Sequence, residues 1–230
     1  GYTFRYKKFL LLTSENSNPL EKVDAYLQCH ERDRVPDQEK IFHSSINFSW
    51  ESIRNLLLPY FDNKLSRLEQ VFLADYNGKL LYNFNPINSS IVKNFEMELI
   101  TPILNEKLIS IGPQIKKSEK YDSNLDVGKL PLRAILKKNG HDTLIGTQKL
   151  GFNVNTINLW KNHGHKLCKE LLSDSRIVKD NLINSDWIQK YIDSPELDVK
   201  YVNKFFGILA LEIWYRLFVT KEMSSNTTLD

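Results

Sequence analysis

Apolar residues recur at spacings of three and four along most of this 230-residue chain, whereas strict two-residue alternation is nearly absent. One such stripe consists of Ile53, Leu56, Leu57, Tyr60 and Phe61. Spacings of three and four place side chains on one face of an α-helix, whereas alternation by two is typical of a β-strand. The pattern therefore predicts a mostly α fold without a substantial parallel sheet.

Local signals predict where the helices begin and end. Asn18 is expected to cap a helix that starts at Pro19, because asparagine can accept an N-terminal backbone N–H and proline suits the first helical position. Gly78 and Pro86 are expected to interrupt the chain between two helices. Helices are predicted at residues 4–12, 20–29, 49–61, 65–73, 87–99, 105–111, 156–172, 185–192 and 199–220.

Length and composition limit the organisation of the chain. We expect a single helical domain over residues 1–220, a mobile, lysine-rich surface loop over 112–126 and a frayed tail over 221–230. The chain begins Gly1-Tyr2, without an initiator methionine or signal peptide, which indicates a fragment, a processed product or an excised domain. Two cysteines without a metal-binding or redox spacing favour a reduced intracellular compartment.

The segment Gly128–Phe152 carries the residues best suited to meet an anion. It combines a basic helix that carries Lys129 and Arg133 with the cluster Gln148-Lys149-Leu150-Gly151-Phe152. Glycine lets the backbone approach a phosphate, and lysine supplies a mobile positive charge. Lys149 is either such a phosphate contact or a solvated lysine in a turn. Because Lys129 and Arg133 are four residues apart, they share a helix face and form either a phosphate-binding patch or a solvated basic strip.

Glu98 is a candidate general base. It precedes the proline-containing segment Thr101–Leu104, where an acidic side chain could be partly buried. Burial raises the pKa of a carboxylate toward values that suit a base, although an ordinary surface glutamate is the alternative. The histidines lack acidic neighbours at ligand spacing, which argues against a metal site. Walker A, GxGxxG and Gly-x-Ser-x-Gly patterns are absent.

Three segments, in this order, resemble the synthetase half of the asparagine synthetase family. Residues 97–105 are similar to V-E-x-R-x-P-F-L-D, Lys129–Phe152 to K-x-x-L-R … K-x-G-F, and residues 206–218 to the closing L-E-x-W-x-R-x-F helix. Gly1-Tyr2 also resembles the end of the family's acidic pyrophosphate loop, D-E-x-F-x-G-Y. The resemblance implies the helical C-terminal part of an adenine-nucleotide alpha-hydrolase-like (N-type ATP pyrophosphatase) synthetase domain, without its nucleotide-binding sheet.

The same resemblance implies a cytoplasmic, glutamine-hydrolysing carbon–nitrogen ligase of asparagine biosynthesis. ATP would activate a carboxylate, aspartate or an analogue, as an acyl-adenylate, which ammonia then attacks. Lys149 would contact the ATP phosphates and the intermediate, Glu98 would position or deprotonate the nucleophile, and Arg133 would support the site, with Lys129 in the same basic patch. The family's S-G-G-x-D-S loop is not in this sequence, so ATP and Mg²⁺ are expected to be bound mainly by an upstream nucleotide-binding domain. A glutaminase domain is the further expected partner, and a homodimer is allowed.

The chain departs from the family pattern at four positions. Asn88 and Ser89 stand where the family has the acid and arginine of D-R-x-S-M, Ile100 replaces the arginine of V-E-x-R, and Asn105 replaces an aspartate. These departures support an alternative, a non-catalytic helical interaction module that completes or docks on a separate nucleotide-binding chain. In either case the segment alone is expected to be inactive. Nucleic-acid binding and membrane association are not expected, because the net charge is only +3 and no apolar run approaches the ~20 residues of a membrane span.

Overall fold

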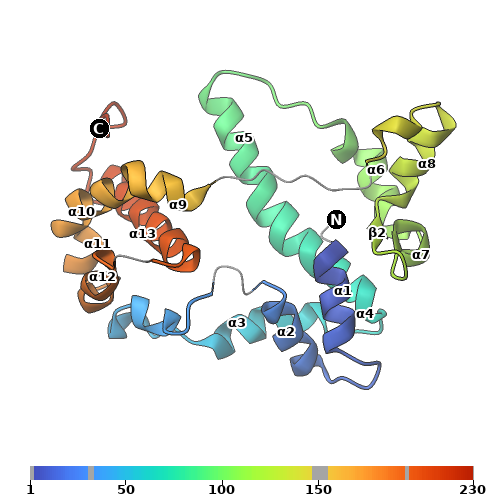
Figure 1. Cartoon of the computed structure of the whole chain (residues 1–230), viewed down its shortest axis with the longest axis horizontal. Coiled ribbons are helices and arrows are strands. Elements are labelled where there is room, and N and C mark those ends of the chain that lie inside the picture. Colours follow the sequence, from blue (N-terminus) through green and yellow to red (C-terminus); the bar gives the residue numbers. More distant parts are fainter. Residues whose placement is uncertain (1–2, 31–33, 147–154, 195–196, 230) are drawn as a thin grey trace. The chain divides into compact units, whose positions relative to one another are not determined.

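The computed structural model describes residues 3–30, 34–146, 155–194 and 197–229. The chain divides into two compact units, the first made of Gly1–Cys29 and Ile53–Lys149 and the second of His30–Ser52 and Leu150–Asp230 (Figure 1). The sequence predicts one helical domain over 1–220, whereas the contacts in the structure form these two units. The mostly α fold class is confirmed, because the described residues contain helices and a single two-stranded sheet.

The first unit is built from short helices and one hairpin. Strands β1 (Tyr121–Asp122) and β2 (Val127–Gly128) pair antiparallel. One of the three points at which the chain passes from one unit to the other falls inside α3. The α-helices are α1 (Thr3–Leu12), α2 (Pro19–Gln28), α3 (Trp50–Leu57), α4 (Arg67–Ala74), α5 (Asn85–Asn94), α6 (Glu106–Ile111), α7 (Lys117–Lys120) and α8 (Leu130–Lys138). The short 3-10 helices are η4 (Leu58–Tyr60), η6 (Pro102–Leu104), η7 (Gly112–Gln114) and η8 (Asp142–Leu144).

The start of α2 confirms the predicted cap. Asn18 Oδ1 accepts the backbone N–H of Glu21 at 2.9 Å, and the Glu21 carboxylate accepts the backbone N–H of Asn18 at 3.0 Å. Pro19 occupies the first helical position. This reciprocal capping box satisfies two backbone donors that a helix N-terminus otherwise leaves without a partner.

The predicted interruption after α4 is wrong. A π-helix, η5 (Asp75–Phe84), follows α4 directly and leads into α5, so helical backbone continues from Arg67 to Asn94 (Figure 1). Pro86 is tolerated because it lies in the first turn of α5, where the hydrogen-bond pattern changes from π to α and a missing N–H costs little. The helix predicted over 87–99 therefore begins earlier and ends at Asn94.

Residues 112–126, which the sequence predicts as a mobile loop, contain defined elements. The structure has η7, α7 and most of the β1–β2 hairpin in this stretch. Tyr121 is only 3% exposed, and its hydroxyl donates to Asp126 Oδ1 at 2.8 Å. A Cβ at Gly128 would lie 2.9 Å from Thr3 Cγ2, so the glycine allows the hairpin to pack closely on α1.

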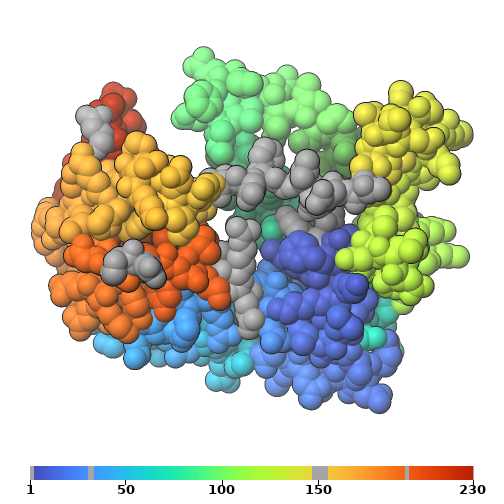
Figure 2. Space-filling view, in the orientation of Figure 1, coloured from blue at the N-terminus to red at the C-terminus, as the bar shows by residue number. Residues whose placement is uncertain are grey.

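The first unit has one hydrophobic core and one largely uncovered stretch. The core contains Tyr6, Phe9, Val23, Ala25, Tyr26, Phe61, Leu68, Val71, Ala74 and Tyr121. The uncovered stretch, residues 76–111, includes the green atoms in the upper part of Figure 2. Its exposed large apolar side chains are Tyr76, Leu80, Leu81, Tyr82, Phe84, Ile87, Ile91, Phe95, Met97, Leu99, Ile100, Ile103, Leu104, Leu108, Ile109 and Ile111.

The second unit packs its helices against α13 (Val199–Phe218), in which Phe205 is fully buried and Leu209 is 5% exposed. Phe218, at the end of the helix, is 65% exposed. The predicted helix at 185–192 is confirmed as α12. The other elements are η2 (Gln38–Ile41), η3 (Ser44–Ile46), α9 (Thr156–Leu159), the π-helix η9 (Trp160–Gly164), α10 (His165–Ser173), α11 (Arg176–Lys179) and α12 (Ser185–Ile192).

Candidate functional site

Lys149, the residue with the strongest predicted role, lies outside the described residues, as does the rest of the cluster Gln148–Phe152. The proposed contact between Lys149 and a phosphate therefore stays a prediction. The other three predicted site residues, Glu98, Lys129 and Arg133, all lie in the described part of the first unit.

The basic helix α8 carries Arg133 but not Lys129. Lys129 precedes the helix in a left-handed backbone conformation, with φ of 59°, and its side chain is exposed. Arg133 is half-buried, and its Nε donates to the carbonyl oxygen of Gly128 at 3.0 Å. The predicted helix face shared by the two cations is thus corrected: Lys129 presents a solvated charge, whereas Arg133 fixes the junction between β2 and α8.

Glu98 lies exposed in the irregular segment between α5 and η6. The partial burial on which its role as a general base depends is therefore not present in this structure. No hydrogen bond or ion pair within the described residues joins Glu98 to Lys129 or Arg133. The structure does not bring these three side chains into direct contact.

One buried carboxylate with many hydrogen-bond partners was not a predicted site residue. Glu212, in α13, is fully buried, and its carboxylate accepts the Ser175 hydroxyl at 2.8 Å. It also accepts the backbone N–H groups of Arg176 at 2.9 Å and Ile177 at 3.1 Å, and Arg216 Nε at 2.5 Å. Burial alone would raise the pKa of Glu212, but these hydrogen bonds hold it below its ordinary value.

Arg216 extends this network to the preceding helix. One of its terminal nitrogens donates to the carbonyl oxygens of Leu171 at 3.0 Å and Asp174 at 2.9 Å, near the end of α10. The cation thus meets helix C-terminal carbonyls while the Glu212 anion meets the first N–H groups of α11, the arrangement that helix dipoles favour. An acid and a base four residues apart in an otherwise apolar helix are the sequence signal of such a buried pair.

A second buried titratable pair lies in the first unit. The Tyr26 hydroxyl donates to Asp75 Oδ1 at 2.8 Å, and Asp75 is 6% exposed at the start of the π-helix η5. Burial raises the pKa of both groups, more strongly than the Tyr26 hydrogen bond lowers that of Asp75. This pair could not be predicted from the sequence, because a long-range contact between α2 and η5 leaves no local pattern.

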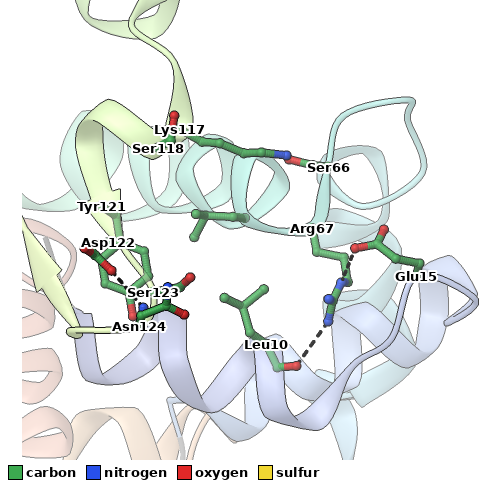
Figure 3. Close-up of a pocket in the computed structure, with 11 residues that line it drawn as sticks. Leu10, Glu15, Ser66, Arg67, Lys117, Ser118, Tyr121, Asp122, Ser123 and Asn124 are labelled. Atoms are coloured by element: carbon green, nitrogen blue, oxygen red, sulfur yellow. Dashed lines mark hydrogen bonds and ion pairs between the residues drawn. The ribbon is translucent and has the colours of Figure 1, made fainter.

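A polar cavity of about 430 Å³ opens between α1, the start of α4, α7 and the β1 turn of the same unit (Figure 3). Its apolar floor is formed by Leu10 and Leu68. Its polar lining includes Arg67, Lys117, Ser118, Asp122, Ser123 and Asn124. None of the predicted site residues lines this cavity.

Metal binding and membrane insertion find no support in the described ranges. No group of three or more histidine, cysteine, aspartate and glutamate side chains there is arranged to hold a metal ion. Within those ranges, no helix combines the length and apolarity needed to cross a bilayer.

The described residues thus contain two helical units, one hairpin and a closing helix held by Glu212 and Arg216, which fits the helical part of a synthetase domain. The family described as asparagine synthase matches residues 1–216. The chain therefore belongs to the asparagine synthase family, whose members are ATP-dependent, amide-forming synthetases. Searches of curated proteins and of solved structures each found no match to the chain.

Proposed function

We propose that this chain is the helical C-terminal part of an enzyme that adenylates a carboxylate and converts it to an amide. A carboxylate oxygen attacks the α-phosphorus of ATP, pyrophosphate leaves, and ammonia from glutamine then displaces AMP from the acyl carbon. The family match over residues 1–216 carries this proposal. The reaction would take place in the cytoplasm, with aspartate or an analogue as the substrate.

Lys149 is the proposed contact to the ATP phosphates and to the adenylated intermediate. A loop lysine beside glycine is suited to this role, since it offers a mobile charge that can follow the negative charge of the departing phosphate. Lys129, with its exposed ammonium group close to α8, is proposed to add to the positive field. Arg133 is a positioning residue in this proposal, because its Nε is bonded to the Gly128 carbonyl oxygen.

Glu98 is proposed to position or deprotonate the attacking ammonia. Its exposed location requires that substrate or another domain covers it during the reaction, because a solvated carboxylate is a weak base. The many exposed apolar side chains of residues 76–111, which flank Glu98, provide a surface that such a covering domain could bury.

The nucleotide itself is proposed to bind mainly to an upstream nucleotide-binding domain. The sheet in the described residues has two strands, whereas a doubly wound nucleotide-binding domain needs a parallel sheet. No group of three or more acidic, histidine or cysteine side chains in the described ranges could hold Mg²⁺, so the ion too is proposed to bind mainly to the upstream domain. A glutaminase domain is the proposed source of ammonia, and a homodimer is compatible with this arrangement.

The alternative is a non-catalytic module that docks on a separate nucleotide-binding chain. The same exposed apolar stretch of residues 76–111 favours it, together with Ser89 and Ile100 at positions where the family has arginines. Both functions need a partner domain, so the exposed stretch cannot distinguish them. The effect of replacing Lys149 on the reaction rate distinguishes the two functions.

The deciding experiment is Lys149→Ala in the assembled protein that contains this chain, with Lys138→Ala, an exposed lysine at the end of α8, as the matched control. Substrate-dependent release of pyrophosphate and association with the nucleotide-binding domain are measured together. The catalytic proposal expects a loss of rate of about 10²-fold or more with intact association, the scale seen when one preorganised electrostatic contact is removed. An unchanged rate would favour the docking module.

A second measurement tests the requirement for the partner domain. The 230-residue chain alone is expected to release no pyrophosphate from ATP when the carboxylate substrate is added. Substrate-dependent release by the isolated chain would contradict the proposed division of labour.

A further inference from the structure

Charged side chains line the cavity of the first unit on several sides. Figure 3 shows the Lys117 side chain extending along one side toward Ser66, and Asp122, Ser123 and Asn124 at the turn that follows β1. Arg67 and Glu15 lie at the other end, where Arg67 Nε and Glu15 Oε1 form an ion pair at 3.0 Å. The charges of Arg67 and Glu15 therefore satisfy each other, which leaves Lys117 and Asp122 as the charges that a ligand would meet.

Lys117 has no direct partner among the residues drawn in Figure 3. The nearby Lys120 already has partners. Its ammonium group donates to the carbonyl oxygen of Pro113 at 3.2 Å and lies 5.7 Å from the ring centre of Phe72. Lys117 instead acts at longer range: after the hydrogen bonds from Ser66, its charge helps to lower the pKa of Glu69. An ammonium group that lines a cavity without a bonded carboxylate is available to an anion.

Asp122 is held in place by its own turn. Its Oδ1 accepts the backbone N–H groups of Asn124 at 2.9 Å and Leu125 at 3.0 Å, while Oδ2 takes part in neither bond. The hydroxyl groups of Ser118 and Ser123 form no hydrogen bond with the other residues drawn in Figure 3. The turn thus holds Asp122 Oδ1. Asp122 Oδ2 and the hydroxyl groups of Ser118 and Ser123 remain to bond a ligand.

We propose that this cavity binds a small zwitterion, a molecule whose anionic group meets Lys117 and whose cationic group meets Asp122. A simple anion would be repelled by Asp122, and a simple cation by Lys117, whereas a zwitterion satisfies both. Ser118 and Ser123 supply the remaining hydrogen bonds, and Leu10 and Leu68 contact the aliphatic part of the ligand. A volume of about 430 Å³ lies in the range of small-molecule sites. This site does not depend on the proposed amide synthesis, because it includes none of Glu98, Lys129, Arg133 and Lys149.

The test uses unbranched amino acids as probes, because their chain length measures the separation of the two charges. Glycine, β-alanine, 4-aminobutyrate and 6-aminohexanoate are titrated into the 230-residue chain by isothermal calorimetry, with butyrate and butylamine as singly charged controls. One chain length is expected to bind saturably at a single site, about tenfold or more tightly than either control, since each charge-assisted hydrogen bond contributes on this scale.

Two variants locate the site. Lys117→Gln and Asp122→Asn are each expected to weaken that binding about tenfold, whereas Lys116→Gln, an exposed neighbour that does not line the cavity, leaves it unchanged. Asp122→Asn retains an Oδ1 acceptor for the turn, so the fold is preserved, which circular dichroism checks. Absence of saturable binding by all four probes would overturn the proposal, as would equal binding by the singly charged controls or wild-type affinity in both variants. A rate loss in Lys149→Ala, or its absence, bears only on the synthetase function.

Discussion

Replacing Glu212 by alanine should destabilise the second unit by about 3–5 kcal/mol, the usual cost of removing one partner of a buried ion pair. The magnitude follows from what the substitution leaves behind. Two backbone N–H groups, of Arg176 and Ile177, and the Ser175 hydroxyl lose their acceptor. The Arg216 side chain, 15% exposed, loses its counter-ion. Glu212→Gln keeps the shape and one acceptor but removes the charge, so about 1.5–3 kcal/mol is expected.

Tryptophan fluorescence can measure this effect selectively. All four tryptophans, Trp50, Trp160, Trp187 and Trp214, belong to the second unit, and Trp160 and Trp187 are buried. Urea unfolding followed by their emission therefore reports on the unit that contains Glu212. The control is Glu222→Ala, which removes an ion pair with Arg176 in which both side chains are partly exposed and should cost less than about 1 kcal/mol.

The pH dependence supplies an independent check. Because the pKa of Glu212 is lowered from its ordinary value of 4.5, its stabilisation is complete above that pH and is lost as the pH falls through the lowered pKa. The difference in unfolding free energy between wild type and Glu212→Gln should therefore shrink in acid. If Glu212→Ala unfolds within 1 kcal/mol of Glu222→Ala, or if the difference does not change with pH, the buried network does not stabilise the unit as argued.

Two further predictions test packing and burial. Gly164→Ala should destabilise the second unit by about 1–3 kcal/mol, because the new Cβ would lie 2.6 Å from the Phe206 ring. Gly207→Ala, in open space within α13, should stabilise the same unit by up to about 1 kcal/mol. Urea unfolding followed by tryptophan fluorescence compares the two variants. Asp75→Asn should stabilise the first unit at neutral pH, because burial raises the pKa of Asp75 and ionisation is unfavourable in the fold. Wild-type stability rises as the pH falls through this raised pKa, so the stability advantage of Asp75→Asn over wild type should narrow in acid. Hydrogen exchange of α4 amides measures this difference, and an advantage that grows in acid would contradict the prediction.

Helix positions were predictable where local chemistry sets them. The Asn18–Glu21 capping box fixes the start of α2, and the bounds of α12 follow from its apolar spacing. Both signals lie within a few residues of the boundary that they determine. The whole mostly α fold class follows in the same way, because it depends on periodicity alone.

Features that depend on tertiary contacts were not predictable. The π-helix η5 continues through Gly78, although glycine usually weakens a helix, and it places Asp75 beside Tyr26, which lies far away in the sequence. The lysine-rich stretch 112–126 gains its structure from the burial of Tyr121 against α1 and α4 residues, which no local pattern reveals. The division into two units likewise arises from contacts between distant segments.

The candidate site was predictable only as a set of residue types. Glu98 was predicted to be partly buried but is exposed, and Lys129 was predicted to lie on a helix that in fact begins one residue later. Glu212 and Arg216 were not among the predicted site residues. Burial and hydrogen-bond partners decide the role of each of these side chains, and neither can be obtained from spacing alone.

The closing helix also shows which part of the family resemblance bears on catalysis. Glu212 and Arg216 are fully accounted for by the stability of the second unit, since their bonds join α13 to the end of α10 and the start of α11. A chain that had lost all activity would still need this pair in order to fold. Lys129, by contrast, carries an exposed charge, and Lys149 lies outside the described residues. The choice between a working synthetase and a docking module therefore depends on Lys149 rather than on the better-preserved closing helix.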